Sequence, residues 1–286
     1  MRQSIFVALG LGVAVTVSAC APVSPESEVE RALKSINVID ESNLNDIMLA
    51  AADPNEAVSY FQRTLGENPN RIDLLRGLAA SLVRAKKPQE GSEVWASAVA
   101  HPESTNEDRV NLADSLIRAG DWDQAEIVLD AVPPTFETFK RYRLEAMIAD
   151  GNEEWKKADS FYEIAVGLTT QPSGVLNNWG YSKLTRGEYA KAEDLFNRSL
   201  KYNSSLFTAK NNLVLARGAQ RNYQMPIIQT TQIERAMLLH TLALTAIKQG
   251  DVITGKGLLQ ESINTHPQYF EAAVRSLRAL ENIVIN

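Results

Sequence analysis

Residues 173–206 read SGVLNNWGYSKLTRGEYAKAEDLFNRSLKYNSSL, and their pattern predicts two antiparallel helices joined by a tight turn. Counted from Ser173 as position 1, the residues that carry the pattern are Trp179 at position 7, Gly180 at 8, Gly187 at 15, Tyr189 at 17, Ala192 at 20, Phe196 at 24 and Leu200 at 28. Small residues at positions 8 and 20 let the two helices cross closely, and the large residues fill the groove between them. Glycine at position 15 suits a helix end because it adopts a positive φ without strain.

The same frame returns in units that begin at residues 38, 72, 106, 139, 173 and 207, which are spaced by 33 or 34 residues. This pattern resembles the tetratricopeptide repeat. It predicts an all-α fold, an α-α superhelix (solenoid) of about six to seven repeats over residues 38–267. Residues 268–286 are expected to form the C-terminal capping helix that a solenoid needs.

Two units depart from the pattern. In the unit that begins at residue 139, we expect a small insertion near Gly151. In the unit that begins at residue 207, Pro226 falls at position 20, where a proline would break the second helix. We therefore expect an irregular connection near residues 222–232.

The first 19 residues have the layout of a signal peptide, with an apolar stretch too short for a membrane span of about 20 residues. The residues that end this segment resemble a bacterial lipobox, namely Val17, Ser18, Ala19 and Cys20. They predict a lipoprotein signal peptide over 1–19, a lipidated N-terminus and tether over 20–37, and membrane attachment through lipid on Cys20. By resemblance to other lipoproteins, Ala21 after the cysteine favours the outer membrane. The alternative is an ordinary signal peptide that happens to contain a cysteine.

The chain has 286 residues, a net charge of −6 and no basic run, which argues against nucleic acid as a partner. Its single cysteine excludes an intrachain disulfide, and its three histidines form no metal-binding motif, so no metal site is predicted. Residues 250–257 match GxxxxGK but lack the Ser or Thr that follows in a phosphate-binding loop, and the preceding residues have a helical pattern. We therefore predict no cofactor, no small-molecule substrate and no catalytic residue, and we expect that the protein is not an enzyme.

In this fold the first helix of each pair lines the concave face, and positions 2, 5, 6, 9 and 12 point into the groove. Asparagine occupies position 6 in four units, as Asn43, Asn111, Asn178 and Asn212, and position 5 in two units, as Asn177 and Asn211. Because an amide both donates and accepts, a column of amides can bind the backbone of an extended peptide, and Tyr181 at position 9 would add apolar contact. The alternative is that asparagine merely suits a solvated position. The four tryptophans fall on core positions of the frame, which disfavours a role in ligand binding.

Residues 173–286 resemble the TadD family, tetratricopeptide lipoproteins of the tight-adherence (Flp) pilus assembly system. The segments that carry the resemblance are NNWGYSKLTRGEYAKAEDLF, KNNLVLARGAQRNYQMPI and ERAMLLHTLALTAIKQGD. The resemblance implies a lipid-anchored protein on the periplasmic side of the outer membrane of a Gram-negative bacterium. Its implied partners are the pilus secretin, whose assembly or stability it would support, and other pilus-assembly components.

Two other functions remain open from the sequence. One is a lipoprotein scaffold for a different envelope machine, such as outer-membrane protein assembly or cell-wall synthesis. The other is an envelope enzyme with a solenoid front end, which would need a second domain that the repeat pattern does not leave room for.

Overall fold

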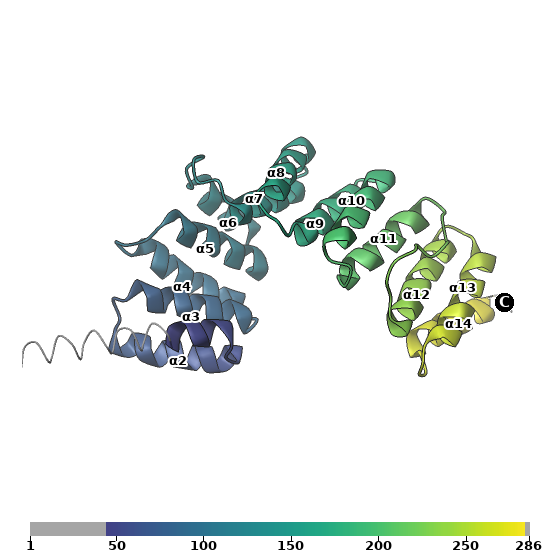
Figure 1. Ribbon diagram of the computed structural model, residues 1–286, viewed down its shortest axis with the longest axis horizontal. Coiled ribbons are helices and arrows are strands. Elements are labelled where there is room, and N and C mark those ends of the chain that lie inside the picture. Colours follow the sequence, from purple (N-terminus) through teal and green to yellow (C-terminus); the bar gives the residue numbers. More distant parts are fainter. Residues whose placement is uncertain (1–43, 284–286) are drawn as a thin grey trace, which may run out of the picture.

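The computed structural model describes residues 44–283, in which every regular element is a helix. The chain forms an arch, with the first helices on one limb and the last helices on the other (Figure 1). Residues 44–50 are helical, and the helices that follow are α2 (Pro54–Glu67), α3 (Ile72–Arg84), α4 (Pro88–Ala100), α5 (Asn106–Ala119), α6 (Trp122–Asp130), α7 (Phe139–Gly151), α8 (Trp155–Gly167), α9 (Ser173–Thr185), α10 (Tyr189–Tyr202), α11 (Phe207–Ala219), α12 (Gln232–Lys248), α13 (Val252–Thr265) and α14 (Glu271–Ile283). The predicted all-α superhelix is confirmed.

The core repeats with the sequence frame. In every unit that has a second helix, the side chain at position 24 is buried. These side chains are Phe61, Trp95, Leu129, Tyr162, Phe196 and, in the last helix pair, whose frame begins at residue 236, Leu259. Position 20 is small and buried in the same units, as Ala57, Gly91, Ala125, Ala158, Ala192 and Gly255. A Cβ atom added to Gly180, at position 8, would lie 2.6 Å from the Phe196 ring, so the two helices of this unit cross too closely for a side chain there.

The turn between the helices of a pair has one backbone conformation in six units. Position 15 has a positive φ in each of them, with Gly120 at 89°, Gly187 at 77°, Gly250 at 84°, Lys86 at 62°, Glu153 at 60° and Arg221 at 61°. Three units therefore hold a non-glycine residue in the left-handed region, which glycine adopts without a steric penalty.

The insertion that we expected near Gly151 is absent. Gly151 is the last residue of α7, and three residues separate it from Trp155 at the start of α8. Three residues also separate α9 from α10, so the two turns have equal length. The prediction was wrong because it took Gly151 as the residue of the turn. Gly151 lies in the helix, and Glu153 adopts the left-handed conformation of the turn instead.

The unit that begins at residue 207 has a first helix, α11, but no second one. Residues 220–231 contain no helix, and Pro226 lies inside this connection. Helix α12 starts afterwards with a capping box, in which the Thr231 side chain and the Glu234 carboxylate each accept a backbone N–H of the other residue. Helix α14 packs against α13 through Ala273, which is buried in the last apolar cluster.

Candidate functional site

Three pockets follow one another along the concave face, and the groove positions of the first helices supply most of their lining. The N-terminal pocket, of ≈ 690 Å³, is lined mainly by α3 and α5. The middle pocket, of ≈ 490 Å³, is lined mainly by α7, α9 and α11. The C-terminal pocket, of ≈ 500 Å³, is lined mainly by α9, α11 and α12.

The middle pocket brings together five of the predicted groove residues. These are Asn177, Asn178 and Tyr181 of α9 and Asn211 and Asn212 of α11. Trp122, Met147, Asp150, Tyr162, Phe207 and Thr208 complete its lining. The pocket therefore combines amides with aromatic and apolar walls and a single carboxylate.

The amides of this pocket bind across the repeats. The Asn212 amide Nδ2 donates to the Asn177 Oδ1 over 3.1 Å, and the Thr241 hydroxyl donates to the Asn211 Oδ1 over 2.8 Å. Asn178 makes a weaker contact, in which its Nδ2 lies 3.8 Å from the Met147 sulfur. Among the described residues, the Asn177 amide NH₂ and the Asn212 amide oxygen form no hydrogen bond, which leaves both a donor and an acceptor for a guest backbone.

The other predicted asparagines lie elsewhere. Asn111 lines the N-terminal pocket, where its Oδ1 accepts a hydrogen bond from the Lys140 ammonium over 2.6 Å. Asn43 lies outside the described residues, as do the lipobox residues and Cys20. The amide column is thus continuous over α9 and α11. It does not extend to α5, because the Asn111 oxygen there is already bound by Lys140.

Two aromatic side chains are exposed at the middle pocket. Tyr181 is 53% exposed, and Trp122, the first residue of α6, is 41% exposed. The expectation that all four tryptophans are core residues was therefore wrong for Trp122. Position 17 begins the second helix, at the rim of the groove, and Tyr189 and Val252 at this position are also exposed.

Asp150 supplies the only charged side chain of the middle pocket lining. The Ser182 and Tyr162 hydroxyls each donate to one of its carboxylate oxygens, Ser182 to Oδ1 and Tyr162 to Oδ2 over 3.1 Å. No ion pair to Asp150 occurs within the described residues. Burial raises the pKa of the Asp150 carboxyl, although these two hydrogen bonds oppose the shift.

An ionic cluster holds α9 against α8 and so positions the amides. The Asp159 carboxylate of α8 accepts hydrogen bonds from the Trp179 indole over 2.7 Å, from Lys183 over 2.6 Å and from Arg186 over 2.7 Å. Burial alone would raise the pKa of Asp159, but these donors outweigh it and hold the pKa at about 2. The Arg186 guanidinium also lies 5.2 Å from the centre of the Trp155 ring.

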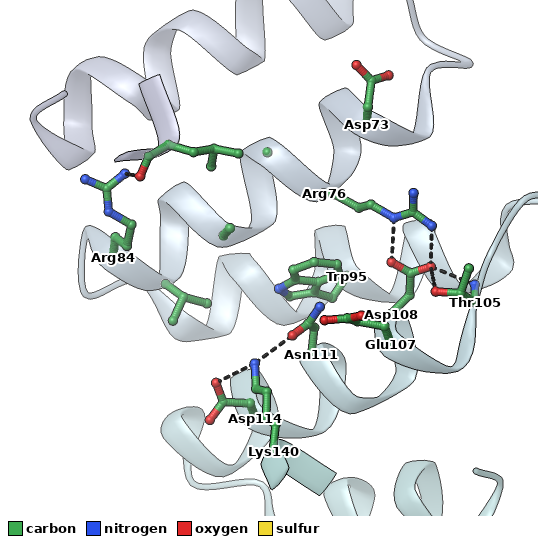
Figure 2. Close-up of a pocket in the computed structure, with 14 residues that line it drawn as sticks. Asp73, Arg76, Arg84, Trp95, Thr105, Glu107, Asp108, Asn111, Asp114 and Lys140 are labelled. Atoms are coloured by element: carbon green, nitrogen blue, oxygen red, sulfur yellow. Dashed lines mark hydrogen bonds and ion pairs between the residues drawn. The ribbon is translucent and has the colours of Figure 1, made fainter. Parts of the chain in front are cut away.

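The N-terminal pocket is crossed by ion pairs whose members bind one another. Figure 2 shows Arg76 of α3 reaching Asp108 at the start of α5, with contacts of 2.7 and 2.8 Å to the two carboxylate oxygens. In the same view Lys140 of α7 lies between Asn111 and Asp114. These bonds connect three successive repeats, so most of the charged groups that would meet a guest here are already engaged, with the exposed Glu107 as the exception.

The C-terminal pocket is mainly apolar. Leu184, Leu215 and Leu244 line it from three successive first helices, together with Tyr189. Leu244 and Tyr189 are exposed. Thr241 also lines this pocket and binds Asn211 of the middle pocket, so the two pockets adjoin.

Several groove residues were missed at the level of sequence, although the repeat frame contains the signal for them. Met147 and Asp150 stand at positions 9 and 12 of the unit that begins at residue 139, and Thr208 stands at position 2 of the unit that begins at residue 207. Applying the groove positions to every residue type, and not to amides alone, would have identified all three.

The GxxxxGK match at residues 250–257 has a packing explanation. Gly255 lies inside α13, and a Cβ atom added to it would clash with the Ile247 side chain and lie 3.1 Å from the Ala243 carbonyl oxygen. In residues 44–283 no group of His, Cys, Asp and Glu side chains could hold a metal ion. Over the part of the chain that the structure describes, no helix is long and apolar enough to cross a membrane.

Comparison with known proteins gives matches among solved structures alone. No protein-family model matches the chain, and no curated protein matches it. The structure of the APC/C hetero-tetramer Cut9-Hcn1 superposes with a TM-score of 0.60 at 14% identity, over 82% of this chain and 48% of that chain, so this protein spans about half of its length. A tetratricopeptide repeat protein from Parabacteroides merdae gives 0.54 at 13% identity, over 91% of this chain and all of that chain.

A third structure is that of PilW, described as a widely conserved type IV pilus biogenesis factor. It superposes with a TM-score of 0.55 at 13% identity, over 82% of this chain and 96% of that chain. Identities this low establish similarity of fold. In its fold, this protein is a tetratricopeptide-repeat superhelix.

Proposed function

We propose that this protein is a non-catalytic scaffold that holds an extended segment of a partner protein in its concave groove. The observation that carries the proposal is the middle pocket, where paired amides of α9 and α11 present a donor and an acceptor beside exposed aromatic rings. Amides bind a peptide backbone with little demand on its sequence, and the adjoining apolar pocket can take an apolar side chain of the same segment.

The scaffold assists assembly of the tight-adherence pilus, and its partner is a segment of the pilus secretin. Two observations support this part of the proposal: the resemblance of residues 173–286 to the TadD family, and the similarity in fold to a type IV pilus biogenesis factor. Lipid on Cys20 confines the protein to the periplasmic side of the outer membrane, and the tether over 20–37 gives it reach. Such confinement raises the effective concentration of the groove near the secretin, so a weak contact can suffice.

The cellular test measures secretin multimer in outer-membrane fractions with and without the gene. We expect the multimer to be lost or mislocalised in the deletion strain, and to be restored by the wild-type protein but not by Cys20→Ser. An unchanged multimer with absent pili would move the function to a later assembly step. An unchanged multimer with normal pili would refute a role in pilus assembly and would favour a role in a different envelope machine.

The groove itself is tested with the double variant Asn178→Ala, Asn212→Ala. It removes one hydrogen bond, from Asn212 to Asn177, and one weak sulfur contact, so the thermal midpoint should change little because such a bond contributes about 1 kcal/mol. Binding of the purified secretin domain should fall. The matched control is Asn197→Ala on α10, where the exposed amide makes no hydrogen bond within the described residues and lies outside the three pockets. Equal binding by the double variant and the control would exclude the amides from partner binding.

A further inference from the structure

The carboxylate of Asp150 lines the middle pocket and forms no ion pair with any residue that the structure describes. The hydroxyls of Ser182 and Tyr162 occupy one acceptor site on each of its two oxygens, which leaves acceptor capacity on both. The cation that acts on Asp150 electrostatically, Arg186, forms its ion pairs with Asp159 and Glu188 instead. A partly buried carboxylate without a cation is costly, so a cation brought by a guest would be stabilised there.

The walls of the middle pocket suit the rest of such a guest. Trp122 and Tyr181 are both exposed and both line the pocket, and Met147 and Phe207 add apolar surface. Aromatic faces attract Lys and Arg side chains, and they also cover the long methylene stems of these residues. Helices α6, α7, α9 and α11, which carry the four residues, follow one another around the crown of the arch (Figure 1).

We infer that the middle pocket accepts a basic side chain of the bound segment, with Asp150 as its counter-ion and Trp122 and Tyr181 as its walls. Arginine fits best because its planar guanidinium can donate to both carboxylate oxygens while it stacks on an aromatic ring. The inference rests on the proposed function, since it names the kind of residue that the groove selects while the amides hold the backbone.

Of the three pockets, the middle one should attract a basic side chain most strongly. In the N-terminal pocket, Asp73, Asp108 and Asp114 are already bound by Arg71, Arg76 and Lys140, so those carboxylates have their cations. The remaining carboxylate there, Glu107, is exposed, and solvent weakens its attraction for a cation. In the C-terminal pocket the lining contains Lys248 and no acidic side chain. A basic side chain of a segment lying in the groove therefore meets an unpaired carboxylate at Asp150.

The test uses two peptides, acetyl-Ala-Ala-Arg-Ala-Ala-amide and the same peptide with citrulline, which has the shape of arginine without its charge. The full-length protein is labelled with ¹⁵N, and the indole N–H signal of Trp122 is assigned by its loss in Trp122→Phe. We expect the arginine peptide to shift this signal saturably and the citrulline peptide to bind at least about tenfold more weakly, a difference of 1.4 kcal/mol.

The variant Asp150→Asn should bind the two peptides equally, with the indole signal of Trp95 in the N-terminal pocket unchanged. The control Asp123→Asn removes a charge next to Trp122, from an exposed side chain that lines none of the three groove pockets, and should keep the preference for arginine. If Asp150→Asn does not fold, the comparison of the two peptides on the wild-type protein still decides. Equal binding of both peptides by the wild-type protein, no shift with either, or an unchanged preference in Asp150→Asn would overturn the inference. Binding of the secretin domain, measured separately, reports on the groove itself.

Discussion

Replacing the three strained turn residues by glycine should stabilise the solenoid. Lys86, Glu153 and Arg221 stand at position 15 of their units with φ near 60°, where three other units hold glycine. Their side chains are exposed and make no hydrogen bond or ion pair within the described residues, so the substitutions remove no contact. The change in stability therefore reports on the backbone alone, both in the folded turn and in the unfolded chain.

The magnitude follows from two opposing terms. A left-handed conformation costs an L-residue about 1–2 kcal/mol. Glycine also gives the unfolded chain more conformational freedom, which lowers the free energy of unfolding by about 0.4–1 kcal/mol and offsets part of the gain. Each substitution should thus raise the free energy of unfolding by about 0.5–1 kcal/mol, and the three together, which lie in separate turns, by about 2 kcal/mol. For a chain of this size about 2 kcal/mol corresponds to a rise of about 4–8 °C in the thermal midpoint.

The assay is thermal and urea unfolding followed by circular dichroism at 222 nm. The reverse substitution, Gly187→Ala, should lower the midpoint, because the only atom that its Cβ would meet is the Tyr189 hydroxyl at 4.0 Å and the penalty is conformational. Lys87→Gly is the control, since Lys87 stands next to Lys86 with a φ of −116° and gains nothing from glycine. It also loses the exposed ion pair of Lys87 with Glu90, so its midpoint should fall slightly. A midpoint that stays the same or falls in all three glycine variants would refute the reasoning.

Three further predictions concern the ion cluster, the core and the anchor. The pKa of Asp159 is about 2 in the folded protein, below the value of 3.8 in the unfolded chain. The contribution of this carboxylate to the free energy of unfolding is therefore complete above pH 3.8 and is lost as the pH falls toward 2. Asp159→Asn should flatten this acid dependence, which amounts to about 1–2 kcal/mol after solvent screening, in urea titrations across that range. Gly180→Ala should lower the unfolding free energy by about 1–3 kcal/mol through collision with Phe196, whereas Gly174→Ala in the same helix, with nothing within 4 Å, should not. Cys20→Ser should leave an unlipidated precursor, and continued outer-membrane fractionation of this variant would refute the anchor.

The repeat frame predicted the helices and the core because each helix pair follows the same packing pattern. Phe61, Tyr162 and Leu259 share one frame position and are all buried, as the pattern requires. The turn at Glu153 was missed because a glutamate has no local preference for a positive φ and adopts it only under the constraint of packing on both sides, although the repeat frame puts this residue at position 15. The glycine at position 151 therefore suggested an insertion that the structure does not contain.

The sequence predicted the amides of the candidate site, but it did not predict the carboxylate of Asp150 beside them. The frame placed Asn177, Asn178, Asn211 and Asn212 on one face, and they do line one pocket. That Asn212 donates to Asn177 depends on the superhelical twist between repeats, which no single-repeat pattern contains. The exposure of Trp122 and the unpaired state of Asp150 likewise follow from how neighbouring repeats meet.

The central claim, that the concave groove holds a partner segment, is tested most directly by photo-crosslinking in living cells. A photoreactive phenylalanine derivative replaces Tyr181, which is 53% exposed in the middle pocket, or Tyr202, which is 60% exposed at the end of α10 outside the three pockets. We predict a covalent adduct with the secretin at Tyr181 that weakens in the Asn178→Ala, Asn212→Ala background, and no such adduct at Tyr202. An adduct at Tyr202 alone, equal adducts at both positions, or none at either would contradict the claim.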